Sequence, residues 1–129
     1  MRRVVITGLG AVSPIGHGKD VFWKALEAGK NGISSFTTVD IDDCPVTFGA
    51  EIKPTDWMES KEAKRSDRVI QFAVAASELA VQDAALDVKS LDPYRFGVYI
   101  GTGQGGIETT FNNFKTMMEK GTRRISPFF

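Results

Sequence analysis

The sequence has few of the residues that build metal, redox or disulfide sites. Its 129 residues include one cysteine, Cys44, and one histidine, His17. A single cysteine excludes an internal disulfide, and this usage suits a reducing cytoplasm. One cysteine and one histidine are also too few for an ordinary zinc site, which draws most of its ligands from these residue types. We therefore expect a cytoplasmic protein without a metal or another cofactor.

The chain also lacks an excess of charge and any long apolar segment. Sixteen basic residues balance sixteen acidic residues, so no net field attracts nucleic acid or an anionic membrane. Only three consecutive apolar residues, 4–6, follow the basic N-terminus, which is too short a run for a signal peptide. No segment approaches the roughly 20 apolar residues of a membrane-spanning helix. We expect no nucleic-acid partner and no membrane association.

The apolar pattern that is present indicates an α/β fold. Apolar residues make up 42% of the sequence, and the length fits a single domain. The continuous apolar runs 4–7 and 96–100 predict strands buried on both faces, as in a parallel sheet. Each run leads into a glycine-rich loop and then a helix. Periodicity and end signals predict three helices, at 20–28, 69–84 and 108–119, and a small hairpin around 46–48.

This set of elements is too small for a complete α/β domain. A typical sheet has about five or six strands, whereas only two are convincing here. The helix at 69–84 is apolar around most of its circumference, so it requires cover on several sides. We therefore expect residues 1–129 to form one partial domain that belongs to a longer protein.

Neither Cys44 nor His17 has the surroundings of a catalytic group. A nucleophilic thiolate needs a cation, a histidine or a helix N-terminus beside it. Cys44 instead follows two carboxylates, and Pro45 disfavours a helical conformation at the cysteine. His17 lies between two glycines in a predicted loop. We interpret both residues as incidental and expect no catalytic centre within this chain.

The loop Gly101–Gly106 has the spacing of a dinucleotide-binding turn, G-x-G-x-x-G, between a predicted strand and a predicted helix. Against that function, no second strand ending in an acidic, ribose-binding residue follows it. The alternative is a tight turn that lets the backbone approach a neighbouring segment closely.

Basic residues gather in two places. Lys61, Lys64, Arg65 and Arg68 are spaced at i, i+3, i+4 and i+7, which on a helix gives one basic face. Such a face is either a solvated surface or a docking site for an acidic partner. Arg123 and Arg124 form a second, smaller cluster.

Several segments, taken in order, resemble the β-ketoacyl-acyl-carrier-protein synthases. The matching segments are RRVVITGLGAVSPIG at 2–16, WKAL at 23–26 with Gly29 and NGI at 31–33, KEAKRSDR at 61–68, the loop 101–106 and RRISPFF at 123–129. The resemblance covers essentially the whole chain, and it is greatest to the type II elongating synthases of dissociated fatty-acid synthesis. It implies the N-terminal half of a thiolase-like fold, layered α-β-α-β-α, in a homodimer.

The resemblance also implies a reaction, decarboxylative Claisen condensation of an acyl group with malonyl-carrier protein. The family uses a cysteine nucleophile, two histidines and a supporting lysine, and the resemblance places all of them beyond residue 129. Cys44 and His17 match none of these positions.

Site residues within this chain are implied by the same resemblance. The positions expected to contact acyl carrier protein are Lys61, Lys64, Arg65, Arg123 and Arg124, with Arg68 added by its spacing. Gln104 and Phe129 match positions of the acyl-chain pocket, where relatives commonly carry a bulky apolar gate at the position of Gln104. A buried amide there disfavours a long acyl chain unless it is hydrogen bonded. An alternative function is that of a non-catalytic ketosynthase-like chain, acting as a carrier-binding or chain-length-determining partner.

Overall fold

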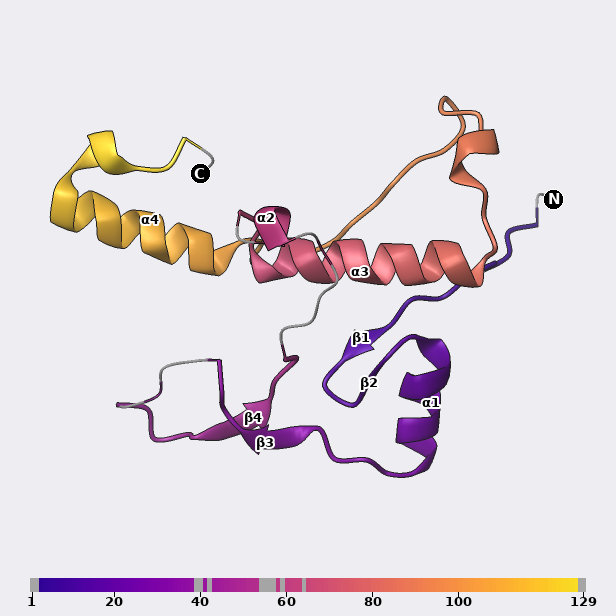
Figure 1. Cartoon of the computed structure of the whole chain (residues 1–129), viewed down its shortest axis with the longest axis horizontal. Helices are drawn as coiled ribbons and strands as arrows, with labels where there is room; N and C mark the ends of the chain where they lie inside the picture. Colours follow the sequence, from indigo (N-terminus) through magenta and orange to yellow (C-terminus); the bar gives the residue numbers. More distant parts are fainter. Residues whose placement is uncertain are drawn as a thin grey trace.

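The computed structural model describes residues 3–38, 41, 43–53, 58, 60–63 and 65–127 (Figure 1). These described residues form four α-helices, two short 3-10 helices and four short strands. In chain order these are β1 Val12–Ser13, β2 Gly16–His17, α1 Lys19–Glu27, β3 Ile33–Ser35, β4 Phe48–Ala50, α2 Ser60–Ala63, α3 Arg68–Asp83, η1 Val88–Ser90, α4 Ile107–Lys120 and η2 Thr122–Arg124.

The three predicted helices are confirmed as α1, α3 and α4, each with ends within one residue of the prediction. Glycines end two of them as expected. Gly29 follows α1 with φ +62°, and Gly121 follows α4 with φ +82°. Both lie in the left-handed region, where glycine has no steric penalty.

The prediction of two buried strands is wrong for this structure. Residues 4–7 and 96–100 form no strand, and Val4 and Ile6 are 94% and 82% exposed. The described residues form two antiparallel pairs instead, β1 with β2 and β3 with β4, the second in place of the hairpin predicted around 46–48. A parallel strand needs hydrogen-bonding neighbours, and the described part of the chain supplies none for either apolar run.

The chain does not enclose a core of its own. Its surface is 11027 Å², whereas a folded monomer of 14.1 kDa has about 6,700 Å². Among the described residues, Ala25 and Ala75 are the only buried apolar ones. Figure 1 shows the corresponding open shape, with α3 and α4 following one another along the long axis. The cover that α3 was expected to need is therefore mostly missing.

The segment before β1 is held against α3 by two glycines and one carboxylate. A Cβ atom at Gly10 would lie 1.9 Å from the carbonyl oxygen of Ala76, and one at Gly8 would lie 2.3 Å from that of Ala80. Asp83 of α3 accepts a hydrogen bond from the Leu9 N–H at 3.0 Å and forms an ion pair with Lys19. The bond with Lys19, followed by that with the Leu9 N–H, holds the pKa of Asp83 below its ordinary value.

Glu51 joins the end of the β3–β4 pair to the residues after β3. Its Oε2 accepts from the Thr37 N–H at 3.1 Å and the Thr37 hydroxyl at 2.7 Å. Its Oε1 accepts from the Thr38 N–H at 2.8 Å and from the Thr38 hydroxyl. The hydroxyl of Thr38, then that of Thr37, lowers the pKa of Glu51 to about 2. The ionised carboxylate thus satisfies four donors at once.

We expect this connection to weaken in acid. Because the folded pKa of Glu51 is about 2 and its ordinary value is 4.5, its stabilising contribution is complete above pH 4.5 and is lost as the pH falls towards 2. The protection of the Thr37 and Thr38 amides from hydrogen exchange, taken relative to the intrinsic rate at each pH, should therefore fall as the pH is lowered across that interval. Glu51→Gln should remove this pH dependence. An unchanged pH profile in the glutamine variant would contradict the assignment.

Candidate functional site

The first basic cluster is divided between two helices instead of forming one helical face. α2 ends at Ala63, and α3 begins only at Arg68, after Asp67 has adopted an extended conformation with ψ 153°. Arg68 is therefore on a different helix from Lys61, and the prediction of a single helical face is wrong. Lys61 and Arg65 are exposed, whereas the predicted docking residue Lys64 lies outside the described residues.

Arg68 is engaged within the fold. Its guanidinium donates to the carbonyl oxygen of Ile52 and lies over the ring of Phe72, 4.9 Å from the ring centre. A cation over an aromatic face is attracted by the ring quadrupole. These two contacts tie the chain after β4 to the start of α3. Arg68 is also half-buried, so it is less available to a partner than Lys61 or Arg65.

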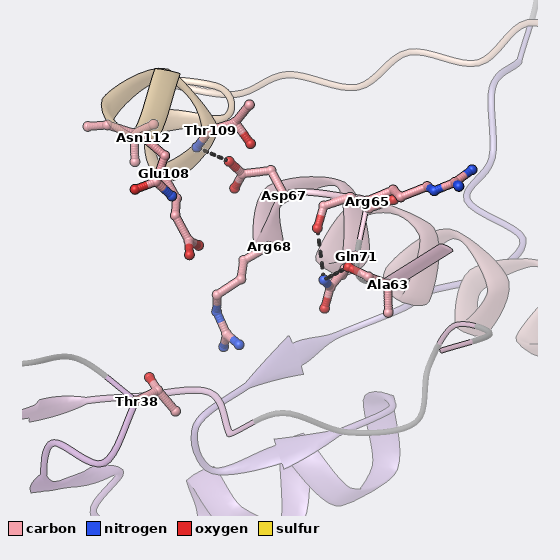
Figure 2. A pocket seen from close by; sticks show the side chains of 11 residues that line it. Thr38, Ala63, Arg65, Asp67, Arg68, Gln71, Glu108, Thr109 and Asn112 are labelled. Atoms are coloured by element: carbon pink, nitrogen blue, oxygen red, sulfur yellow. Dashed lines mark hydrogen bonds between the residues drawn. The ribbon is translucent and has the colours of Figure 1, made fainter. Parts of the chain in front are cut away.

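A cleft of about 940 Å³ lies where the start of α3 meets the start of α4 (Figure 2). Most of its lining residues are of polar or charged types, with both signs of charge present, although apolar atoms contribute more of the lining surface than polar atoms. The residues are Thr38, Ala63, Arg65, Ser66, Asp67, Arg68, Gln71, Ile107, Glu108, Thr109 and Asn112. Figure 2 shows the side chain of Arg65 extending away from Asp67 and Arg68.

Asp67 joins the two helices at this cleft. Its Oδ2 accepts a hydrogen bond from the Thr109 N–H at 3.0 Å, satisfying one of the free donors in the first turn of α4. Burial raises the pKa of Asp67, but the hydrogen bonding with Thr109, together with the proximity of the Val69 and Arg68 N–H groups, outweighs it, so the net shift is downward. A Cβ atom at Gly106 would lie 3.0 Å from the same oxygen, so the glycine permits this close approach.

Sequence reasoning missed this role, although a signal was present. Asp before a helix is a preferred N-cap residue, and Asp67 directly precedes α3. The side chain makes no cap bond to α3, however, and stabilises the N-terminus of α4 instead. Local sequence cannot specify a contact between residues 42 positions apart.

Gln71 fixes the turn that carries Arg65. Its Nε2 donates to the carbonyl oxygens of Ala63 and Ser66, both at 3.0 Å. Helix C-termini leave carbonyl groups without partners inside the helix, and Gln71 supplies one for the end of α2. The exposed Arg65 is therefore presented from a turn tied to α3.

The second basic cluster is on η2, directly after α4. Arg123 and Arg124 are both exposed. The chain beyond them folds back along α4 (Figure 1) and is held there by Asn113, which is only 9% exposed. Asn113 Nδ2 donates to the Thr109 carbonyl at 2.8 Å, and its Oδ1 accepts from the Ser126 N–H at 2.9 Å. The sequence pattern gave no reason to single out Asn113.

Only one of the two predicted acyl-pocket residues, Gln104, is among the described residues. Gln104 is exposed on the 101–106 loop, and Phe129 lies outside the described residues. A Cβ atom at Gly101 or Gly103 would meet nothing within 4 Å. The close approach expected of this loop is thus found only at Gly106. The dinucleotide interpretation loses its structural setting as well, because no strand precedes the loop.

Cys44 and His17, which the sequence suggests are incidental, both lie among the described residues. Cys44 is an exposed thiol, and His17 lies half-buried in β2. Within the described ranges, no group of three His, Cys, Asp or Glu side chains is placed to hold a metal ion. No helix among the described residues is long and apolar enough to cross a membrane.

Comparison with known proteins gives a match over the full length. The family described as "Beta-ketoacyl synthase, N-terminal domain" matches residues 1–129. The 3-oxoacyl-[acyl-carrier-protein] synthase 2 of Staphylococcus aureus (strain COL) is 44% identical over an alignment of 131 positions that covers 99% of this chain and 32% of that protein. The protein of the same name from Synechocystis sp. (strain ATCC 27184 / PCC 6803 / Kazusa) is 43% identical over 98% of this chain and 31% of its own length. This chain thus spans about a third of these curated relatives.

Solved structures of similar chains agree. A β-ketoacyl synthase from Burkholderia phymatum STM815 has a TM-score of 0.74 at 33% identity, covering 99% of this chain and 33% of that chain. The ishigamide ketosynthase/chain length factor has a TM-score of 0.79 at 27% identity, covering 98% and 32%. A type II polyketide acyl-carrier protein in complex with its ketosynthase, AntDE:AntF, gives 0.72 at 30% identity, covering 98% and 29%.

Proposed function

Because the chain belongs to the β-ketoacyl synthase family, of which it matches the N-terminal domain, we propose that it is part of a 3-oxoacyl-[acyl-carrier-protein] synthase. Membership confirms the predicted fold class, an incomplete N-terminal half of the α/β thiolase-like fold. The proposed reaction is the decarboxylative condensation of an acyl group with malonyl-carrier protein during fatty-acid elongation. The observation that carries the proposal is the family match over residues 1–129, together with 44% identity to a synthase of this name over 99% of the chain. We propose a cytoplasmic homodimer as its working form.

The groups that perform the chemistry are proposed to come from outside these residues. A condensing enzyme needs an activated nucleophile within reach of a base. Cys44 is exposed and follows two acidic residues, and His17 is on β2. Neither position supplies the stabilised thiolate that acyl transfer requires.

The contribution of this chain is proposed to be recognition. The exposed basic residues Lys61 and Arg65, together with Lys64 of the same segment, form one contact for an acidic acyl carrier protein. Arg123 and Arg124 on η2 form the other. A structural neighbour of this chain is a ketosynthase described in complex with an acyl-carrier protein. Arg68 is assigned a lesser share because its guanidinium is committed to Ile52 and Phe72.

Gln104 and Phe129 are proposed to line the acyl-chain pocket of the complete synthase. Gln104 is the more informative of the two because its amide is polar. Burying an amide without hydrogen-bond partners costs about 1–3 kcal/mol. A shorter or more polar acyl chain is therefore favoured at this position.

The test compares the isolated chain with the longer protein that contains it. We expect the isolated chain to form no 3-oxoacyl product from acyl- and malonyl-carrier protein, and the longer protein to form it at an unchanged rate after Cys44→Ser. Product formation is measured by mass spectrometry of the carrier. Turnover by the isolated chain, or loss of turnover in the Cys44→Ser protein, would contradict the assignment of the chemistry to other residues.

A second candidate is a non-catalytic chain that determines product length beside an active ketosynthase. It is favoured by the likeness to a ketosynthase/chain length factor. The same experiment separates the two functions. If the longer protein binds carrier but forms product only with an added ketosynthase, the second function is correct.

A further inference from the structure

A continuous hydrogen-bonded relay runs from Asp67, beside the first basic cluster, to the segment that follows the second. Asp67 Oδ2 accepts from the Thr109 N–H at 3.0 Å. The carbonyl of the same Thr109 accepts from Asn113 Nδ2 at 2.8 Å. Asn113 Oδ1 then accepts from the Ser126 N–H at 2.9 Å. The path thus uses the N–H and the carbonyl group of Thr109, and both Nδ2 and Oδ1 of Asn113.

Asn113 is the central member of this relay. Among the described residues it is the only buried polar one, and side chains four apart on a helix lie above one another, which brings its amide to the Thr109 carbonyl. The other end of the amide reaches a backbone donor outside the helix. A leucine of similar shape would leave the Ser126 N–H without this acceptor, and unpaired buried donors are rarely tolerated.

We propose that Asn113 is a positioning residue for carrier-protein docking: through Ser126 it holds η2, and with it Arg123 and Arg124, against α4. This inference rests on the proposed function, since it concerns the affinity for an acidic carrier. The relay continues to Asp67, so the two basic clusters are anchored to opposite ends of one hydrogen-bonded path along α4.

Holding η2 in place favours docking because binding otherwise costs conformational entropy. Immobilising a long side chain or a loop on binding reduces affinity, and a segment held in its bound position beforehand avoids part of this cost. η2 is a single short turn with two exposed arginines, and its backbone hydrogen bonds, from Arg124 to Gly121 and from Ile125 to Thr122, are local. The segment directly after η2, which is hydrogen bonded to Asn113 at Ser126, holds η2 in place.

The experiment measures carrier binding by titration calorimetry for Asn113→Leu, for Arg123→Ala/Arg124→Ala, and for the three substitutions combined. We expect Asn113→Leu to raise the Kd by about 5- to 10-fold. The combined variant should bind no more weakly than the double arginine variant, because Asn113 acts only through those arginines. Additive losses, which indicate independent contributions, would overturn the proposal.

Gln82→Leu is the control, since it replaces an exposed amide side chain on α3 by the same residue. It should leave the Kd and the Ser126 amide unchanged. Amide hydrogen exchange gives a readout that needs no carrier: the Ser126 N–H should lose protection in Asn113→Leu. Retained protection would overturn the relay itself. Absence of carrier binding by the unsubstituted protein would instead overturn the proposed function and leave the exchange result standing.

A second variant covers the case in which Asn113→Leu does not fold. Asn113→Asp keeps an oxygen that accepts from the Ser126 N–H and loses the donor to Thr109. We expect it to retain Ser126 protection and to bind carrier within about 2-fold of the unsubstituted protein. Weak binding with retained protection would overturn the proposal.

Discussion

Gly10→Val is expected, in the longer protein that contains this chain, to lower the free energy of unfolding by about 3 kcal/mol, because overpacking against backbone atoms forces the two segments apart. The Cβ atom would lie 1.9 Å from the Ala76 carbonyl oxygen and 2.8 Å from the Ala80 nitrogen. Helix backbone cannot yield as a flexible side chain can. The segment before β1 would therefore have to leave α3.

The pairing of small residues explains why the contact is so close. Ala76, Ala80 and Ala84 are four residues apart and share one face of α3. Gly8 and Gly10 lie against that face, and each lacks the atom that would collide with a carbonyl group of the helix. Backbone thus meets backbone, and the contact cannot accept a larger residue on the glycine side.

Two measurements test this expectation. Urea denaturation should show the loss of stability, and the Leu9 N–H, which donates to Asp83 at 3.0 Å, should lose its protection from hydrogen exchange. Gly97→Ala is the control, because a Cβ atom there would meet nothing within 4 Å. Equal effects of the two substitutions would show that close approach to α3 is not the cause.

Lys61→Glu/Arg65→Glu is expected to raise the Kd for acyl carrier protein by about 30-fold. Like charges placed opposite one another at an interface cost several kcal/mol when close, and 30-fold corresponds to about 2 kcal/mol. Both side chains are exposed, so the substitutions disturb no packed contact. Arg68 is left unchanged because its contacts with Ile52 and Phe72 would confound the result.

Lys89→Glu/Arg95→Glu is the matched control for this prediction. It makes the same change in net charge on exposed residues of the excursion between α3 and α4 (Figure 1). We expect this control to bind carrier normally. Binding of the unsubstituted protein should weaken as salt rises, because exposed charge contacts are screened. A control that weakens binding equally would indicate a general charge effect instead of docking at Lys61 and Arg65.

The helices illustrate what local sequence signals can predict. α1, α3 and α4 follow from apolar periodicity, and Gly29 and Gly121 mark ends that require a positive φ. These signals act within a few residues of the positions they control. The family resemblance was equally accessible, because it depends on the order of short motifs and not on how they pack.

The apolar runs 4–7 and 96–100 show where such signals fail. Their composition indicates burial on both faces, yet in this chain they are exposed and unpaired. An apolar composition indicates that a segment is stable when it is buried. Forming a strand also requires a neighbouring strand with which it can hydrogen bond. The surface of 11027 Å² reflects the same shortage of partners across the chain.

The sequence by itself determined the helices, the fold class and the positions of the exposed basic residues, because these depend on residue type and short-range order. Only the tertiary structure decided that the first basic cluster is split at Asp67, that Arg68 is committed to Ile52, and that Asn113 joins Thr109 to Ser126. Each of these depends on which other segment the fold brings next to the residue. The sequence shows which side chains can donate or accept hydrogen bonds, and the tertiary structure determines which donor or acceptor each of them meets.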